Sequence, residues 1–156
     1  MILLTVGTQL AFDRLTAAVD EWLVGVDVEV VGQIGLGTYV PKRFRYQDFF
    51  NPSELEDLFS SADLIISHAG MGTIISALTR GKPIVIVPRR ADLGEHRNDH
   101  QIATARKFSS HRSVKPVFDV GQLDAAISEL LSAGAGSGIP QFAPDPMISE
   151  LRKLIG

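Results

Sequence analysis

A glycine-rich turn, S-H-A-G-M-G-T, occupies residues 67–73, between an apolar run and an apolar segment of helical length. A helix N-terminus offers unpaired N–H groups and a partial positive charge, and glycine lets an anion approach that backbone closely. Thr73 adds a hydroxyl donor. The turn therefore predicts a phosphate or diphosphate site. A second interpretation fits the spacing equally well: Gly70 and Gly72 only permit a tight turn from strand to helix.

Two common phosphate-binding loops do not match the sequence. A P-loop needs G-x-x-x-x-G-K-[ST], and no such run occurs. A dinucleotide fingerprint needs G-x-G-x-x-G after the first strand, but G-M-G-T-I-I has Ile75 in place of the third glycine and comes late in the chain. The run G-L-G-T-Y-V from Gly35 fails in the same way. ATP-type loops and NAD-dependent enzymes are therefore disfavoured.

Polar groups follow two other predicted strands. Gly7 and Thr8 come after the first strand, and a polar segment over 89–101 comes after the fifth. In a sheet of the usual order the first and fourth strands are neighbours, so all three groups are expected to border one crevice. The segment suits hydroxyl-rich and anionic ligands, although a solvated loop would have a similar composition. Its polar residues are Arg89, Arg90, Glu95, His96, Asn98, Asp99, His100 and Gln101.

Two histidines in this segment raise the question of a metal. His96 and His100 are four residues apart, so they would point the same way if the segment were helical. No third ligand stands at a matching position in the sequence. We therefore expect neither a metal nor another cofactor.

Short β-rich runs alternate with amphipathic segments along the chain. Continuous apolar runs indicate buried strands, and a Ser53-x-x-Glu56 capping box indicates the start of a helix. The alternation predicts a Rossmann-like α/β fold with a mainly parallel sheet and helices on both faces. We expect one domain over 1–132, and a flexible connector with a short C-terminal helix over 133–156. The expected strands are 2–6, 28–34, 44–50, 64–67, 84–88 and 114–118, and the expected helices include 53–62, 72–80, 96–108 and 122–132.

Composition limits the classes of function. The chain has 156 residues, 45% of them hydrophobic, which suffices for one core, and it has no cysteine for a disulfide or thiolate site. It begins with a strand-like segment, and no apolar run reaches the ~20 residues that cross a bilayer, so we expect a cytoplasmic chain. The net charge of −3 argues against nucleic-acid binding. Residues 80–115 nevertheless carry a net charge of +6, which suits a small anion or reflects solvated helix faces.

Four motifs occur together in a fixed order and span residues 1 to about 105: L-L-T-V-G-T, S-H-A-G-M-G-T, G-K-P-I-V-I-V-P-R and N-D-H-Q. With them the sequence resembles the donor-binding C-terminal half of GT-B glycosyltransferases of family 28. Within that family it is most similar to small stand-alone subunits. These are the donor-binding subunit of the eukaryotic enzyme that adds the second GlcNAc to dolichol-linked sugars, and the PssE-type subunits of bacterial exopolysaccharide glucuronosyltransferases.

The resemblance implies a UDP-sugar donor. The uracil is expected near 44–49, and Asp99 and Gln101 match the family's D-x-Q pattern, which contacts sugar hydroxyls. Many members carry an acidic ribose ligand three positions after the residue equivalent to Thr73, and Ser76 departs from that pattern. The expected diphosphate contacts are Gly7, Thr8, Ser67, His68, Gly70, Met71, Gly72 and Thr73.

Three arginines near the same motifs bear on the choice of donor. Guanidinium groups bind carboxylates well, so Arg89, Arg90 and Arg97 suit a uronic acid and favour UDP-glucuronate. They suit the diphosphate equally. Arg89 and Arg90 are therefore expected substrate contacts in either case.

The resemblance also implies an inverting, metal-free transfer. The chemistry needs a general base on the acceptor and positive charge against the departing UDP. The length accommodates only the donor half, so we expect a membrane-anchored partner subunit that holds a lipid-linked oligosaccharide acceptor, as in bacterial exopolysaccharide synthesis, and recruits the chain to the inner face of the membrane. His68, Glu95 and His96 are local candidates for catalysis. The alternatives are a regulatory nucleotide-sugar-binding module and a stand-alone nucleotide-sugar hydrolase or epimerase.

Overall fold

The structure is a computed structural model that describes residues 1–134. The connector and terminal helix expected toward the C-terminus lie outside these residues, except that positions 133 and 134 still belong to the last described helix. Among the helices of residues 1–134, none is long and apolar enough to span a bilayer.

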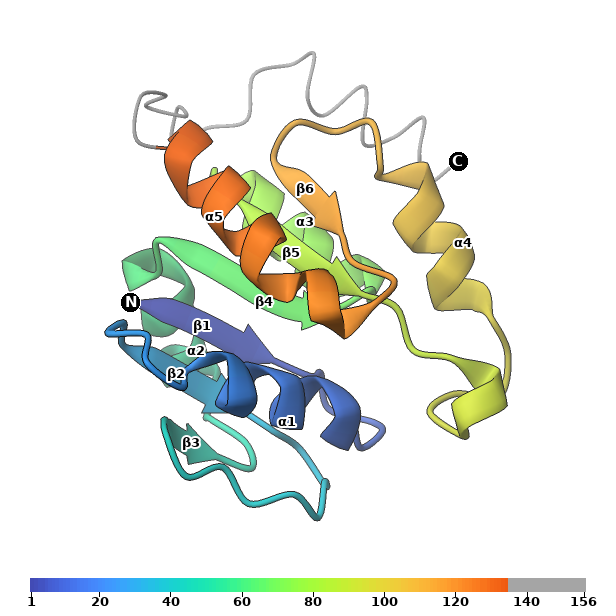
Figure 1. Ribbon diagram of the computed structural model, residues 1–156, viewed down its shortest axis with the longest axis horizontal. Helices are drawn as coiled ribbons and strands as arrows, with labels where there is room; N and C mark the ends of the chain where they lie inside the picture. Colours follow the sequence, from blue (N-terminus) through green and yellow to red (C-terminus); the bar gives the residue numbers. More distant parts are fainter. Residues whose placement is uncertain (135–156) are drawn as a thin grey trace.

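Six parallel strands form one sheet in the order β3-β2-β1-β4-β5-β6, so the expected Rossmann-like fold is confirmed. The order reverses between β1 and β4, which lie side by side with Thr5 opposite Ser67. The arrows in Figure 1 run in one direction, so every strand ends at the same edge. The strands are β1 (Ile2–Thr5), β2 (Val30–Gln33), β3 (Arg45–Gln47), β4 (Leu64–His68), β5 (Ile84–Val87) and β6 (Val114–Pro116).

Helices cover both faces of the sheet because its central strands are apolar on both sides. Side chains of α1 and α5 pack on one face, and those of α2, α3 and α4 pack on the other (Figure 1). The helices are α1 (Asp13–Trp22), α2 (Pro52–Ser61), α3 (Met71–Thr79), α4 (His100–Lys107) and α5 (Leu123–Gly134), with 3-10 turns η1 (Ala91–Leu93) and η2 (Val120–Gln122).

The capping box of α2 differs from the predicted one. The Asn51 side chain accepts a hydrogen bond from the Glu54 N–H (2.9 Å), and the Glu54 carboxylate accepts one from the Asn51 N–H (3.1 Å). Pro52 fits the first helical position, where its missing N–H has no partner to lose. The predicted box of Ser53 and Glu56 is therefore wrong, and Glu56 instead pairs with Arg80 (2.5 Å).

The predicted helix over 96–108 begins only at His100. Gly94 adopts a left-handed conformation (φ 70°) that ends η1, and the Asn98 side chain accepts the His100 N–H (3.0 Å). The segment before His100 therefore stays a loop. Because His96 is outside the helix, the helical spacing on which a histidine metal pair depended does not exist.

Asp20 of α1 is fully buried and holds the connection between β2 and β3. Its carboxylate accepts hydrogen bonds from the Tyr39 hydroxyl (2.8 Å) and from the N–H groups of Lys42 (3.1 Å) and Arg43 (2.8 Å). Burial alone would raise the pKa of Asp20, but these hydrogen bonds and the charge of Arg43 outweigh it and lower the pKa. The carboxylate therefore stabilises the fold in its charged form.

Replacement of Asp20 should destabilise the protein strongly. Asp20→Ala leaves the Tyr39, Lys42 and Arg43 donors without the buried acceptor that orders this connection, so we expect the free energy of unfolding to fall by about 3 kcal/mol in urea denaturation. The exposed Asp57→Ala is the matched control and should change it by less than about 0.5 kcal/mol. Because the folded pKa of Asp20 lies below 3.8, its contribution is present above pH 3.8 and is lost as the pH falls below that value. Equal unfolding midpoints for the two variants would contradict this role.

Candidate functional site

The two glycine turns meet where the strand order reverses. Because β1 and β4 are adjacent and parallel, the segments that follow them leave the sheet at the same edge. Gly7 follows β1 with φ 79°, a conformation that favours glycine. The side chain of His68, the last residue of β4, lies against Gly7. The structure therefore brings the Gly7–Thr8 turn and the turn at 67–73 together.

His68 explains two of the glycines. A Cβ on Gly7 would lie 2.9 Å from His68 Cε1, and a Cβ on Gly70 would lie 2.2 Å from His68 Nε2. Gly70 has ordinary extended dihedral angles (φ −86°, ψ 131°), so the turn itself does not require glycine there. The two glycines make room for the imidazole ring.

Gly72 has no such internal reason to be glycine. It is exposed, and it lies in the first turn of α3. Apart from its two chain neighbours and the backbone of its own helix, no atom of the described residues comes within 4 Å of the position that its Cβ would take. Glycine in a helix costs about 1 kcal/mol relative to alanine. The space beside its backbone is open to a ligand.

The N-terminus of α3 is uncapped. Its N-cap residue is Gly70, and no side chain within residues 1–134 accepts a hydrogen bond there. The first intrahelical bond runs from the Ile74 N–H to the Gly70 carbonyl (3.1 Å), so the N–H groups of Met71, Gly72 and Thr73 have no intrahelical partner. Three donors and the positive end of the helix dipole therefore point at the open space beside Gly72.

Ser67 and His68 hold each other rather than face this space. Ser67 is fully buried, and its hydroxyl donates to the His68 carbonyl (2.8 Å) and lies 3.1 Å from His68 Nδ1. Burial and the charge of Arg89 lower the pKa of His68 to about 4, although a hydrogen bond with the Thr5 backbone opposes them. His68 is therefore neutral at pH 7 and adds no charge to the turn.

The structure differs from the expectation at Arg89. Its side chain is only 2% exposed, and its guanidinium donates to the carbonyls of Val6 (2.6 Å), Leu10 (2.8 Å) and Ala11. All three belong to the loop between β1 and α1. Arg89 is not presented to a ligand, because its side chain is buried and its guanidinium donates to these three carbonyls.

Two other residues of the polar segment are also held by internal contacts. The Glu95 carboxylate binds Arg14 of α1 through two hydrogen bonds (2.8 and 2.9 Å) and accepts the Arg90 N–H (3.0 Å). The Gln101 side chain is nearly buried and accepts the Arg89 N–H (3.0 Å). Glu95 is therefore unsuited to act as a base, because its proton-accepting oxygens already bind Arg14.

The remaining predicted residues lie on the surface of the same loop. Asp99 is exposed, and its carboxylate accepts the Ala91 N–H (3.1 Å). Arg90 pairs with Asp92 (2.5 Å), and the His96 imidazole accepts the Asn98 N–H through Nδ1 (3.3 Å). Within the part of the chain that the structure describes, no three His, Asp or Glu side chains gather as metal ligands.

Sequence reasoning missed Phe12 and Arg14. The Phe12 ring contacts two guanidinium groups, with the Arg89 carbon at 4.7 Å and the Arg14 carbon at 5.3 Å from its centroid. Arg14 also donates to the Pro88 carbonyl (3.1 Å). Arg89, Pro88 and Glu95 are more than 70 residues away from Phe12 and Arg14 in the chain, so no local pattern could have indicated these contacts.

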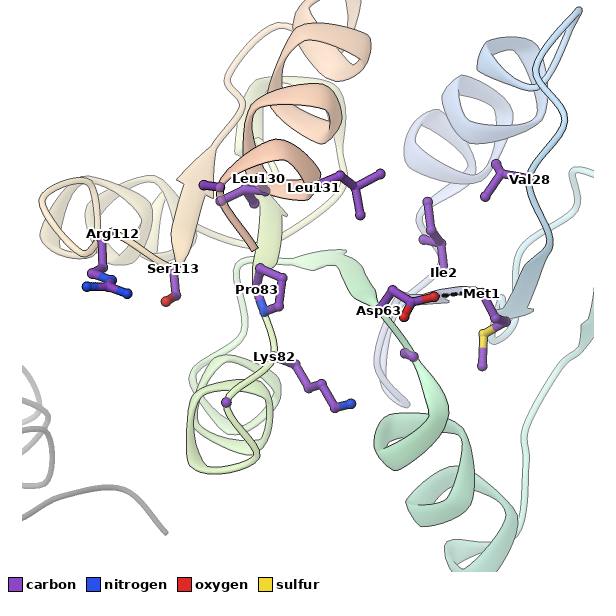
Figure 2. A pocket seen from close by; sticks show the side chains of 13 residues that line it. Met1, Ile2, Val28, Asp63, Lys82, Pro83, Arg112, Ser113, Leu130 and Leu131 are labelled. Atoms are coloured by element: carbon purple, nitrogen blue, oxygen red, sulfur yellow. Dashed lines mark hydrogen bonds and ion pairs between the residues drawn. The ribbon is translucent and has the colours of Figure 1, made fainter. Parts of the chain in front are cut away.

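A groove of about 730 Å³ lies at the opposite, amino edge of the sheet. It lies beside the C-terminal ends of α2, α3 and α5, which carry partial negative charge. Figure 2 shows Leu130 and Leu131 from the end of α5, and Met1 joined to Asp63 by an ion pair (2.6 Å). Lys82 and Arg112 also line the groove, but none of its lining residues belongs to a helix N-terminus, so the open N-terminus of α3 at the carboxyl edge is the better candidate for an anion site.

His68 should stay neutral throughout the physiological pH range. Because its pKa of about 4 lies below the ordinary value of 6.5, the neutral ring stabilises the fold fully above pH 6.5, and that contribution is lost as the pH falls toward 4. The His68 ring signals in NMR, assigned with a His68→Asn variant, should not shift between pH 8 and about 5.5. A titration midpoint near 6.5 would show that the ring is not buried as described.

Comparison with known proteins identifies relatives of this chain. The chain is 38% identical over 116 residues to mouse (Mus musculus) UDP-N-acetylglucosamine transferase subunit ALG13. This match covers 67% of this chain and 9% of that protein. It is 34% identical over 85 residues to the UDP-N-acetylglucosamine--N-acetylmuramyl-(pentapeptide) pyrophosphoryl-undecaprenol N-acetylglucosamine transferase of Geobacillus thermodenitrificans. This match covers 53% of this chain and 20% of that enzyme.

Among solved structures, the glycotransferase of kitacinnamycin matches with a TM-score of 0.64 and 21% identity, over 98% of this chain and 37% of that one. The chain thus spans less than half the length of each of these proteins. Residues 1–136 match the glycosyltransferase family 28 C-terminal domain. The chain therefore belongs to the glycosyltransferase family 28 C-terminal domain family.

Proposed function

We propose that the chain is the UDP-sugar-binding subunit of a two-chain inverting glycosyltransferase that acts on a lipid-linked acceptor. One observation carries the proposal: Gly72 stands in an uncapped helix N-terminus, beside open space, at the reversal of the strand order. No described contact requires glycine at that position. A diphosphate close to the backbone N–H groups of Met71, Gly72 and Thr73 would require it.

The same N–H groups suit the departing UDP. In an inverting transfer the acceptor oxygen attacks the anomeric carbon while the bond from that carbon to the phosphate oxygen breaks, and the electron pair leaves with UDP. Fixed backbone donors and a helix dipole stabilise the charge that develops on the diphosphate. We infer that this stabilisation needs no metal, since oriented dipoles supply the positive potential.

UDP-GlcNAc is the donor that we propose first. Both curated relatives described above are named as N-acetylglucosamine transferases. Two of the three arginines that would favour UDP-glucuronate already make contacts within the protein, because Arg89 is buried and Arg90 pairs with Asp92. Arg97 is exposed and remains the one candidate of the three for a uronate carboxylate. UDP-glucuronate, and a role in bacterial exopolysaccharide synthesis, are therefore the second choice.

The general base is proposed to come from the partner. A base works best with a pKa near the working pH, and the pKa of His68 is about 4. Glu95 is bound to Arg14. Of the three local candidates, only His96 keeps a loop position without a carboxylate or arginine contact in the described residues. A partner that holds the acceptor would bring the base with it, and would recruit this chain to the inner face of the membrane.

A rim of exposed apolar side chains supports a partner at this edge. We define the rim as five residues, each in a connection that follows the carboxyl end of a strand: Leu10, Leu36, Phe49, Leu93 and Phe118. They are 41–67% exposed. A partner that covers this edge would bury these exposed side chains, and their carboxyl-edge position would seat an acceptor-binding subunit over the donor.

Gly72→Val should block UDP-sugar binding without harming the fold. Valine would fill the open space beside the helix N-terminus, and it is no worse than glycine in a helix. We expect the Kd for UDP and UDP-GlcNAc, measured by calorimetry, to rise by roughly tenfold or more, which is about 1.4 kcal/mol or more. Ala125→Val, on the exposed face of α5, adds the same branching away from the site and should leave the Kd unchanged.

The donor-site proposal fails if none of UDP, UDP-GlcNAc and UDP-glucuronate raises the melting temperature of the wild-type chain. A ligand at about 100 times its Kd should add ~2.7 kcal/mol of stability. Unchanged UDP affinity in Gly72→Val would place the diphosphate elsewhere.

Transfer should require the partner and the rim. We expect sugar transfer from UDP-GlcNAc only when the chain is co-purified with a membrane-anchored protein encoded beside it. The pair Leu93→Glu and Phe118→Glu should abolish co-purification and transfer, while UDP affinity stays at the wild-type value. The control pair is Val24→Glu and Val26→Glu. It introduces charge at two other exposed apolar residues, which precede β2 at the opposite edge, and should leave the complex intact.

The same assays separate the alternative functions. Turnover by the chain alone would favour a hydrolase or epimerase, and binding without transfer in the complex would favour a regulatory module.

A further inference from the structure

Arg89 connects two segments that border the proposed diphosphate site. It follows β5, and its guanidinium donates to the carbonyls of Val6, Leu10 and Ala11 in the loop between β1 and α1. Among residues 1–134, these are the hydrogen bonds that hold Leu10 and Ala11. The loop residues from Thr8 to Ala11 are exposed, so this one side chain fixes a segment that has little packing of its own.

Arg89 is itself fixed from several directions. Its N–H donates to Gln101 of α4, and its guanidinium stacks on the Phe12 ring at 4.7 Å. Arg14 also lies over the Phe12 ring, and its ion pair with Glu95 joins α1 to the loop after β5 a second time. The guanidinium therefore has a single well-defined position from which to hold the loop.

Within residues 1–134, no carboxylate contacts the guanidinium of Arg89. Its guanidinium partners are backbone carbonyls, and the nearby Glu95 is already bound to Arg14. Leaving a buried cation without a carboxylate costs free energy unless something else compensates it. An anion bound on the other side of the Gly7–Thr8 turn would provide that compensation.

We propose that Arg89 is a positioning residue: its guanidinium holds the loop after β1 so that Gly7 and Thr8 face the open N-terminus of α3, and its buried charge attracts the ligand's diphosphate. This inference rests on the proposed donor function. It assigns Arg89 an indirect role in place of the direct ligand contact that its position in the sequence suggests.

The test compares Arg89→Met and Arg89→Lys with the wild-type chain by amide hydrogen exchange and by UDP calorimetry. We expect Arg89→Met to raise exchange at residues 8–11 by about an order of magnitude while β4 stays protected, and to raise the Kd for UDP roughly tenfold. Arg89→Lys keeps the charge but lacks the planar fork that reaches three carbonyls, so exchange at residues 8–11 should rise and the Kd should increase less.

Arg80→Met is the matched control. Arg80 also stacks on a phenylalanine, with its guanidinium carbon 5.4 Å from the Phe59 centroid, and pairs with Glu56 away from the site. It should lower the unfolding midpoint without changing exchange at residues 8–11 or the Kd for UDP. Wild-type exchange and wild-type Kd in a folded Arg89→Met would overturn the proposal.

If Arg89→Met does not fold, Arg89→Lys decides, and wild-type exchange with wild-type Kd in that variant would equally overturn it. A wild-type chain that binds no UDP would refute the donor function. The exchange comparison would still decide whether Arg89 holds the loop, because it is made on the protein without ligand.

Discussion

The reversal of strand order between β1 and β4 is the constraint on which the rest of the molecule depends. All six strands are parallel, so every strand ends, and every following helix begins, at the same edge. At the reversal the two chain segments leave in opposite directions and cannot cover the edge between them. The turn after β1, the start of α3 and the loop that carries Arg89 are brought together for this reason alone. The strand order leaves this part of the edge uncovered, and the side chains of these segments only determine its detailed shape.

Charge is distributed in agreement with that topology. The carboxyl edge holds the unpaired N–H groups of α3 and the buried guanidinium of Arg89, while His68 beside them is neutral. The amino edge gathers the negative ends of α2, α3 and α5 around its groove. The helix dipoles thus favour an anion at the carboxyl edge, although Lys82 and Arg112 add positive charge to the groove at the amino edge.

The sequence predicted the sheet well because parallel central strands are continuously apolar, as in β4 and β5, and because the alternation with helices leaves few topologies. It predicted which turns would meet. It failed at helix starts, where Asn51 rather than Ser53 caps α2, and where a loop persists up to His100. It also could not assign roles within the site. Arg89 and Glu95 look like ligand contacts in a polar run, but their partners lie in the loop after β1 and on α1, about 80 residues earlier, and only the folded chain reveals them.

The imidazole of His68 occupies the side-chain space of two glycines, and this restricts how relatives of the protein can diverge. A methyl group at position 70 becomes tolerable only after His68 has been replaced by something smaller, because the backbone there is otherwise ordinary. Position 7 has no such route, since its positive φ disfavours any side chain even when the ring is gone. Substitutions at positions 68 and 70 should therefore appear in a fixed order during evolution, with the histidine replaced first. Glycine at position 7 should be retained even in relatives that have lost both His68 and Gly70.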